Sequence, residues 1–375
     1  MDEPAVLLND FPRQWEAVRE AVHEAVERVG ASGRYILGPE VSEFERRLAE
    51  LWPVAHAVGV GNGLDALEIG LRCLEVKDGD RVLTTPLSAF ATTLAILRVG
   101  AVPVFADVDE RGLLDLKACR EMLRRDRDVR ALVPVHLYGH ALDLGELEAI
   151  RTDFGIALLE DCAQSIGAES NGRRTGTVAD VAATSFYPTK NLGALGDGGA
   201  LLTRDDAIAA RARALRHYGQ TATYVHDFVG LNSRLDEVHA AVLAQALLPH
   251  LETWTRRRRE VAARYLEGLS NPALELSSEP PGSRSVWHLF PVLVPQGSRD
   301  SFVRHLRGHG VSVGMHYPCL IPDQRALQGR RFEVAGELAR ARRFADSEVS
   351  LPIHPFLADS EVDRVVEACN GWSAT

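Results

Sequence analysis

Five short apolar segments, each followed by ten or more residues of largely helical character, most constrain how this chain can fold. They cover residues 55–60, 81–85, 101–106, 131–136 and 156–160. Such alternation predicts βαβ units that build a mostly parallel sheet covered by helices on both faces. Ligands bind beyond the carboxyl ends of the strands in such sheets, so the residues after these segments are the first candidates for a functional site.

Two helices are expected before this alternating region. Residues 13–29 carry apolar side chains at helical spacing, and a second helix is expected from Ser42 to Leu51. Ser42 and Glu45 have the spacing of a capping box, in which each side chain binds the other's backbone amide. The sequence therefore predicts that Ser42 opens the second helix.

The length of 375 residues exceeds one typical core, so two domains are expected. A long helical pattern interrupted at Pro249 leads into a polar loop, and the boundary is placed between about residues 245 and 285. We predict a large α/β domain over residues 1–250 and a small C-terminal α+β domain over residues 251–375. The small domain is expected to contain strands at 287–294 and 311–317 and helices at 300–309 and 359–370.

Composition argues against several classes of protein. The net charge of -10 disfavours nucleic acid as the main partner. The five cysteines are odd in number and form no C-x-x-C pair, which fits reduced thiols in a cytoplasm and predicts neither a disulfide framework nor a metal site. Residues 1–4 begin acidic, so no signal peptide is expected, and no apolar run is long enough to cross a membrane.

Asp161 and Lys190 are the strongest catalytic candidates. Asp161 directly follows the last of the apolar segments, so a buried strand is expected to deliver its carboxylate into a crevice. A carboxylate in that place suits a cofactor with a basic pyridine nitrogen, and a lysine that can lose its proton suits the cofactor's aldehyde. The pair therefore suggests pyridoxal 5′-phosphate, although a capped strand end with an unrelated surface lysine gives the same pattern.

A glycine-rich turn at 58–67 lies between an expected strand and an expected helix. Free backbone amides at a helix start bind phosphate groups. The third glycine of a dinucleotide motif would fall at Leu64, and the turn lacks the lysine of a nucleoside-triphosphate loop. The turn therefore favours one terminal phosphate, with a simple tight turn as the alternative. Phe90, after the next strand, could stack on a flat ring or belong to the core.

Seven segments, in this order along the chain, together resemble the DegT/DnrJ/EryC1/StrS family of sugar aminotransferases. The resemblance spans essentially the whole chain and is most specific around Lys190. It implies fold type I of the pyridoxal phosphate enzymes and a homodimer with active sites at the subunit interface. The segments are GPEVSEFE (38–45), GNGLDAL (61–67), PVHLYGH (134–140), EDCAQ (160–164), SFYPTKNLGALGDGGA (185–200), NSRLDE (232–237) and GMHYP (314–318).

The resemblance also implies residue roles. Lys190 corresponds to the Schiff-base lysine and Asp161 to the partner of the pyridine nitrogen. The other cofactor positions are Gly63, Leu64 and Ser185 at the phosphate, Phe90 over the ring, Gln164 near the phenolic oxygen, and Asn232 reaching the phosphate of the other subunit. Tyr187, His316 and Tyr317 are expected to contact the sugar, although the histidine that often follows in the family is absent between Cys319 and Gln324.

The implied reaction moves the amino group of L-glutamate to a keto-sugar nucleotide in deoxyaminosugar biosynthesis. The residues around Lys190 resemble the branch that acts at carbon 3, so the expected acceptor is a dTDP-linked 3-keto-6-deoxyhexose. Amination at carbon 4 or of a keto-cyclitol is the alternative, and a cofactor-binding regulator is the non-enzymatic one. A dehydratase branch carries histidine in place of the lysine, so Lys190 argues against it.

Overall fold

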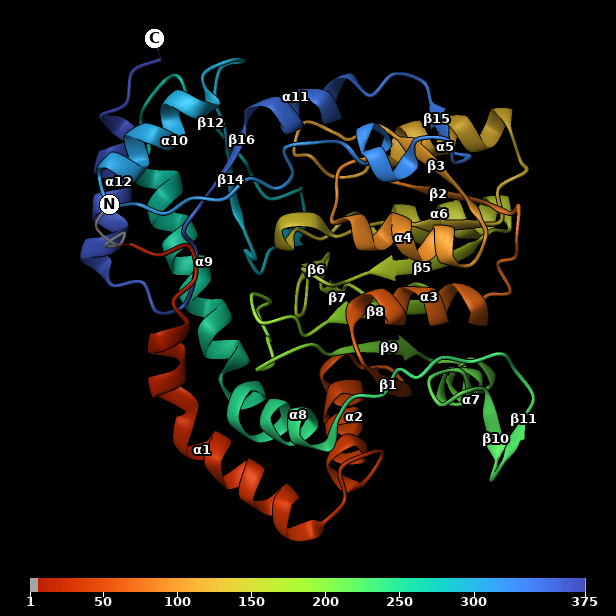
Figure 1. Ribbon diagram of the computed structural model, residues 1–375. Helices are drawn as coiled ribbons and strands as arrows, with labels where there is room; N and C mark the ends of the chain where they lie inside the picture. Colours follow the sequence, from red (N-terminus) through yellow and green to blue (C-terminus); the bar gives the residue numbers. More distant parts are fainter. Residues whose placement is uncertain (1–5, 375) are drawn as a thin grey trace.

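A computed structural model describes residues 6–374, so the expectation about a signal at residues 1–4 lies outside the described residues. An eight-stranded sheet forms the centre of the molecule (Figure 1). Its order is β1-β9-β8-β5-β4-β2-β3-β15, and only the pairs that involve β9 are antiparallel. The strands are β1 (His56–Val60), β2 (Arg81–Thr84), β3 (Val102–Ala106), β4 (Ala131–Val133), β5 (Ala157–Asp161), β8 (Val181–Ser185), β9 (Gly199–Thr203) and β15 (Glu333–Ala335).

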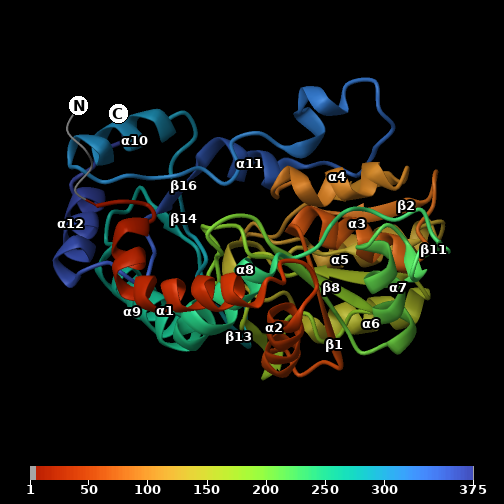
Figure 2. The same ribbon diagram turned by 60° about the horizontal axis from the view of Figure 1, so that its bottom comes forward.

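Both faces of this sheet are covered, which explains why its strands are continuous apolar runs. Successive side chains point to opposite faces, so Leu83 and Leu158 pack on one side while Val82 and Leu159 pack on the other. Figures 1 and 2 show the covering helices. One face carries α5 (Leu116–Arg125) and α6 (Leu144–Phe154), and the other carries α3 (Gly63–Cys73), α4 (Phe90–Arg98) and α7 (Asp206–Leu215).

The alternating pattern therefore predicted the mostly parallel α/β fold correctly. The five apolar segments became β1, β2, β3, β4 and β5, with helices between them.

A third apolar layer joins α1 (Phe11–Ser32), α2 (Pro39–Leu51) and α8 (Glu237–Val242) to the edge of the sheet. The capping box predicted at Ser42 is wrong, because α2 begins at Pro39 and Ser42 donates to the carbonyl of Gly38. The carboxylate of buried Glu237 instead accepts the amide hydrogens of Gly38, Glu40 and Val41, at 2.7 to 2.9 Å. A residue distant in sequence thus replaces the local cap.

The C-terminal part packs around a three-stranded antiparallel sheet of order β12-β14-β16. Figure 1 shows this part to the left of the large sheet, with α9 leading toward it from α8. Its elements are α9 (Leu251–Gly268), β12 (Glu275–Leu276), β14 (Phe290–Leu293), α10 (Arg299–Gly308), α11 (Ala339–Ser347), β16 (Glu348–Leu351) and α12 (Asp359–Asn370). The helices predicted at 300–309 and 359–370 are confirmed.

The strand predicted at 311–317 is wrong. Only single bridges form there, from Val311 to Val6 and from Gly314 to Ser350. The chain leaves the sheet because the amide of His316 donates to the carboxylate of Glu348 and so has no strand partner. The division at residue 250 stays a prediction, and β15, which lies beyond it, pairs with β3 of the large sheet.

No helix in residues 6–374 has the length and apolar character needed to span a membrane. The five cysteines are free thiols.

Several short elements connect the helices and strands given above. The short elements are η1 (Leu137–Gly139), β6 (Glu169–Ser170), β7 (Arg173–Arg174), β10 (Gln220–Ala222), β11 (Val225–His226), η2 (Leu243–Leu247), η3 (Leu248–His250), β13 (Ser283–Arg284), η4 (Ile321–Asp323) and η5 (Arg325–Leu327).

Candidate active site

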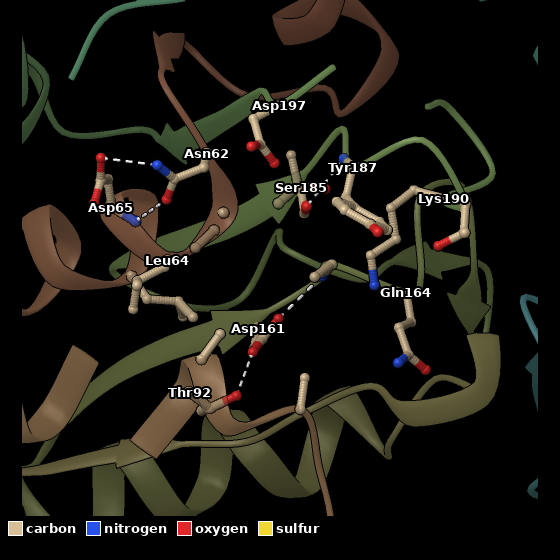
Figure 3. A pocket seen from close by; sticks show the side chains of 18 of the residues that line it. Asn62, Leu64, Asp65, Thr92, Asp161, Gln164, Ser185, Tyr187, Lys190 and Asp197 are labelled. Atoms are coloured by element: carbon tan, nitrogen blue, oxygen red, sulfur yellow. Dashed lines mark hydrogen bonds between the residues drawn. The ribbon is translucent and has the colours of Figure 1, made fainter. Parts of the chain in front are cut away.

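A pocket of about 640 Å³ collects most of the predicted site residues beyond the carboxyl ends of the parallel strands. Figure 3 shows Asp161 and Lys190 reaching into it from different strand ends. The predicted residues that line it are Gly63, Leu64, Asp161, Gln164, Ser185, Tyr187, Lys190, His316 and Tyr317. Phe90 and Asn232 are not among its lining residues.

Asp161 is the last residue of β5 and is almost completely buried. Its carboxylate accepts hydrogen bonds from the Thr92 hydroxyl at 2.8 Å and from the Ala163 amide at 3.0 Å. Burial raises the pKa of Asp161, while these hydrogen bonds and the charge of Lys190 oppose the shift. The carboxylate is therefore held in one orientation in a site where a cationic partner stabilises its charge.

Lys190 follows β8 in a turn that its amide closes on the carbonyl of Tyr187 at 2.8 Å. Burial lowers the pKa of its ammonium to about 8, and the charge of Asp161 acts in the opposite direction. About a tenth of the Lys190 side chains are thus uncharged at pH 7, far more than for a lysine of ordinary pKa. An amine of this kind can attack an aldehyde and can exchange protons.

The start of α3 forms a phosphate-sized cradle. Asn62 caps the helix, since its side chain accepts from the Asp65 amide at 2.8 Å. A β-carbon added at Gly63 would lie 2.7 Å from the β-carbon of Ser185, so this position has no room for a side chain. The helix start offers backbone amides and a positive dipole end, and the Ser185 hydroxyl lies beside it. These groups fit the phosphate of pyridoxal phosphate.

Hydrogen bonds connect the side chains on the side of the pocket opposite the α3 cradle. The Tyr138 amide donates to Gln164 Oε1 at 2.7 Å, and Gln164 Nε2 donates to the Tyr317 hydroxyl at 3.3 Å. The Tyr138 hydroxyl donates to the carbonyl of His316 at 2.7 Å. Burial, helped by the charge of Lys190, lowers the pKa of His316 to about 4, so its ring is neutral at physiological pH.

Phe90, which is expected to stack over a cofactor ring, is not among the residues that line the pocket. It is the first residue of α4 and packs against the cluster of Phe105, Ile321 and Leu327. Its neighbours Ala89, Ala91 and Thr92 line the pocket, whereas Phe90 itself does not. The stacking of Phe90 over a cofactor ring stays a prediction.

Asn232 is exposed and lies in the segment that runs beside the glycine turn of the same chain. Its neighbour Ser233 accepts a hydrogen bond from the Gly61 amide at 3.0 Å. The role of Asn232 at the phosphate of another subunit stays a prediction.

Sequence reasoning missed three residues of the site. Thr92 orients Asp161, and its position at a strand–helix junction was the available signal. Asn62 could have been found as a favoured helix cap within the glycine turn. His288 also lines the pocket, with its Nδ1 atom 3.1 Å from Asn191 Oδ1, and no sequence pattern indicates it.

One group of side chains in the described residues has metal-ligand chemistry, namely His136, Glu160 and Cys162. The Glu160 carboxylate lies 2.8 Å from His136 Nε2 and accepts the amides of Gly176 and Val178. These hydrogen bonds occupy the carboxylate oxygens and tie β5 to the loop that contains Gly176 and Val178.

Comparison with known proteins agrees with this geometry. The family model described as "DegT/DnrJ/EryC1/StrS aminotransferase family" matches residues 16–370. The dTDP-3-amino-3,4,6-trideoxy-alpha-D-glucose transaminase of Streptomyces venezuelae is 41% identical over 375 residues, which covers 99% of this chain and 97% of that protein. The erythromycin biosynthesis sensory transduction protein EryC1 of Saccharopolyspora erythraea is 42% identical, with 98% of each chain covered.

A solved structure extends the similarity to the fold. The crystal structure of S. venezuelae DesV in complex with a ketimine intermediate superposes with a TM-score of 0.93 at 40% identity, covering 99% of each chain. The expected fold and the resemblance noted in the sequence are thereby confirmed. The chain belongs to the DegT/DnrJ/EryC1/StrS aminotransferase family.

Proposed function

We propose that this protein uses pyridoxal 5′-phosphate to move the amino group of L-glutamate to carbon 3 of a keto-sugar nucleotide. The observation that carries the proposal is the meeting of Lys190, Asp161 and the α3 cradle in one pocket. An amine of lowered pKa, a buried carboxylate and a phosphate site are the three groups that this cofactor requires. The proposed acceptor is a dTDP-linked 3-keto-6-deoxyhexose.

The residues of the chain have separate tasks in this reaction. Bound pyridoxal phosphate supplies an aldehyde for the donor's amine and a ring that withdraws electrons from the donor's α-carbon. Lys190 Nζ would move the proton from that carbon to the cofactor's 4′-carbon, and in the second half-reaction from the 4′-carbon to carbon 3 of the sugar. Asp161 keeps the ring nitrogen protonated, and the start of α3 with Ser185 holds the phosphate.

The choice of acceptor rests on the relatives. The S. venezuelae relative is named for a 3-amino sugar linked to dTDP, and it matches this chain along nearly its whole length. An amine is transferred only to a carbonyl held within reach of it, so the placement of the sugar ring selects the carbon. Tyr187, His316 and Tyr317 are the proposed contacts of the sugar.

A panel of acceptors tests the function. The purified protein, loaded with cofactor, is given L-glutamate and then 3-keto or 4-keto nucleotide sugars or a keto-cyclitol, and the product is identified by NMR. Release of 2-oxoglutarate and a new amine at carbon 3 is expected. Amination at carbon 4 or of the cyclitol would overturn the choice of acceptor. An absorbance that does not respond to glutamate would favour a regulator that binds the cofactor without turnover.

We also propose that two copies of the chain share their active sites, with Asn232 of one copy reaching the phosphate of the other. Its exposure beside the glycine turn leaves it available for such a contact. Mixing Lys190→Ala with Asn232→Ala subunits should then create one intact site in each mixed dimer. Mixing Lys190→Ala with Asp161→Ala is the matched control, because both residues belong to the same chain's pocket and no intact site forms. Equal activity of the two mixtures, with subunit exchange confirmed, would contradict the shared site.

A further inference from the structure

The buried carboxylate of Glu348, the first residue of β16, is connected to the pocket through two hydrogen bonds. Its Oε2 atom accepts the backbone amide of His316 at 2.5 Å, and its Oε1 atom accepts the hydroxyl of Ser350. The Ser350 oxygen lies 2.8 Å from Nδ1 of the His316 ring. No basic side chain of residues 6–374 forms an ion pair with Glu348. The pyridoxal phosphate chemistry described above does not use this carboxylate.

The Glu348 carboxylate, the Ser350 hydroxyl and the His316 ring form a hydrogen-bonded series. The proton positions in this series follow from the number of hydrogens available. An ionised carboxylate only accepts, so the single hydroxyl proton of Ser350 points to Glu348. Ser350 must then accept from His316, which places the ring proton on Nδ1 and leaves a lone pair on Nε2. Nε2 makes no hydrogen bond to the described residues, and His316 lines the pocket. A neutral His316 in this state therefore has an acceptor at Nε2 that no described residue uses, on a side chain that lines the pocket.

Protonation of Glu348 reverses the two side-chain bonds of the series, from Ser350 to Glu348 and from His316 Nδ1 to Ser350, while the His316 amide still donates to Oε2. The carboxyl proton is then donated to Ser350, the Ser350 hydroxyl turns to Nδ1, and the ring proton moves to Nε2. Nε2 becomes a donor, although the ring remains neutral. The charge state of Glu348 thus determines whether Nε2 of His316 accepts or donates a hydrogen bond.

We propose that Glu348, acting through Ser350, is a positioning residue that sets the tautomer of His316, so that Nε2 accepts a hydrogen bond from a hydroxyl of the acceptor sugar. The sugar contact rests on the proposed function, whereas the control of the tautomer does not. Recognition of a hydroxyl by a buried acceptor of fixed polarity discriminates strongly against analogues that lack that hydroxyl.

The surroundings allow both states near neutral pH. Burial raises the pKa of Glu348 to about 7, opposed by the hydrogen bonds from Ser350 and His316 and by the charge of Arg299. His316 stays neutral because burial lowers its pKa to about 4. The other titratable groups that face the series are Lys190, His288, Tyr138 and Tyr317. Of these, only Lys190, with a pKa of about 8, also titrates in the neutral range.

Nitrogen NMR of the histidine rings tests the tautomer directly. The full-length protein is labelled with ¹⁵N-histidine, and the signals of His316 are assigned by their loss in His316→Asn. We expect the Nδ1–H form at pH 8.5 and the Nε2–H form at pH 5.5. The same reversal is expected in Lys190→Ala, which removes the second titrating group. The Nε2–H form at pH 8.5, where Glu348 is ionised, would overturn the proposal without any variant of Glu348.

Glu348→Gln gives the sharper test because the amide cannot ionise. Its oxygen accepts from the His316 amide, so its NH₂ group donates to Ser350 and fixes the Nε2–H form at every pH. Wild-type behaviour of the His316 signals in this variant would overturn the proposal. Ser347→Ala is the matched control for Ser350→Ala, since Ser347 is a buried serine outside the series. Ser350→Ala should abolish the pH response and Ser347→Ala should keep it.

Kinetics then test the sugar contact. At pH 8.5, Glu348→Gln should raise the KM for the keto-sugar nucleotide about tenfold, the usual scale for one hydrogen bond of reversed polarity. The rate of the glutamate half-reaction should stay within twofold, and an equal loss in both halves would indicate a structural role. If no keto-sugar is aminated by the wild-type protein, the proposed function fails while the NMR result still decides the control of the tautomer.

Discussion

The two walls of the pocket are built in different ways. The sheet wall, made of Gly63, Asp161, Ser185 and Lys190, lies at or next to the ends of β1, β5 and β8. The C-terminal wall, made of His316 and Tyr317, lies in a segment that forms no strand and is held by hydrogen bonds to Tyr138, Gln164 and Glu348. The groups proposed to hold the cofactor thus lie on the rigid sheet. Two of the three proposed sugar contacts, His316 and Tyr317, lie in a segment that can vary without altering the sheet.

The largest expected effect is on the sheet wall. Lys190→Ala should lower turnover by about four orders of magnitude, because it removes both the aldehyde partner and the proton carrier. The variant should still bind pyridoxal phosphate, since Asp161 and the α3 cradle remain. Steady-state rates and equilibrium dialysis measure the two properties. Lys77→Ala, which changes an exposed lysine, is the control. Normal turnover of Lys190→Ala would remove Lys190 from the mechanism.

Asp161→Asn should slow turnover about a hundredfold at saturating cofactor, because the ring nitrogen loses its charge partner while the side-chain volume is kept. The thermal midpoint of unfolding should change little. Asp346→Asn, at an exposed aspartate, should leave both quantities unchanged. An unaltered rate in Asp161→Asn would mean that the carboxylate only supports the fold.

The rate at which the cofactor-free protein captures pyridoxal phosphate should depend on pH. Only the uncharged amine of Lys190 reacts, so the rate should rise about tenfold per pH unit below the pKa of about 8 and level off above it. The charge of Asp161 raises the pKa of Lys190, so Asp161→Asn should move this plateau to lower pH. Stopped-flow absorbance measures the profile. A plateau reached only near pH 10.5 would show that Lys190 is not perturbed.

Gly63→Ala should weaken cofactor binding about tenfold, because the new β-carbon would lie 2.7 Å from that of Ser185 and must displace it from the phosphate cradle. Gly30→Ala is the matched control, since no atom lies within 4 Å of the β-carbon added there, inside helix α1. Fluorescence titration with pyridoxal phosphate compares the two variants. Equal affinities would place the phosphate elsewhere.

The smallest expected effect tests the C-terminal wall. Tyr317→Phe removes the acceptor of the Gln164 amide and should raise the KM for the keto-sugar about fivefold, the scale of one hydrogen bond. The glutamate half-reaction, measured by the loss of cofactor absorbance, should not change. A comparable loss of activity in the glutamate and keto-sugar half-reactions would contradict the functional difference between the two walls.

Sequence patterns predicted the sheet wall well because its geometry is local. Asp161 ends β5, one of the predicted strands, Lys190 follows β8, and parallel strands bring their carboxyl ends to one edge. The position of Phe90 could not be predicted, because it depends on which face of α4 meets the cluster of Phe105 and Ile321. The C-terminal wall was predicted as a strand, since its irregular course is imposed by the distant Glu348.

The cap of helix α2 has a consequence for folding. Its first amides, at Gly38 and Val41, are satisfied by Glu237, whose separations along the chain are 199 and 196 residues. Contacts between such distant residues require closure of a long loop and form late in folding. Protection of these amides from hydrogen exchange should therefore appear only when the strands of the large sheet are already assembled. Protection of the first amides of α2 would thus report the end of folding, although these residues lie near the N-terminus.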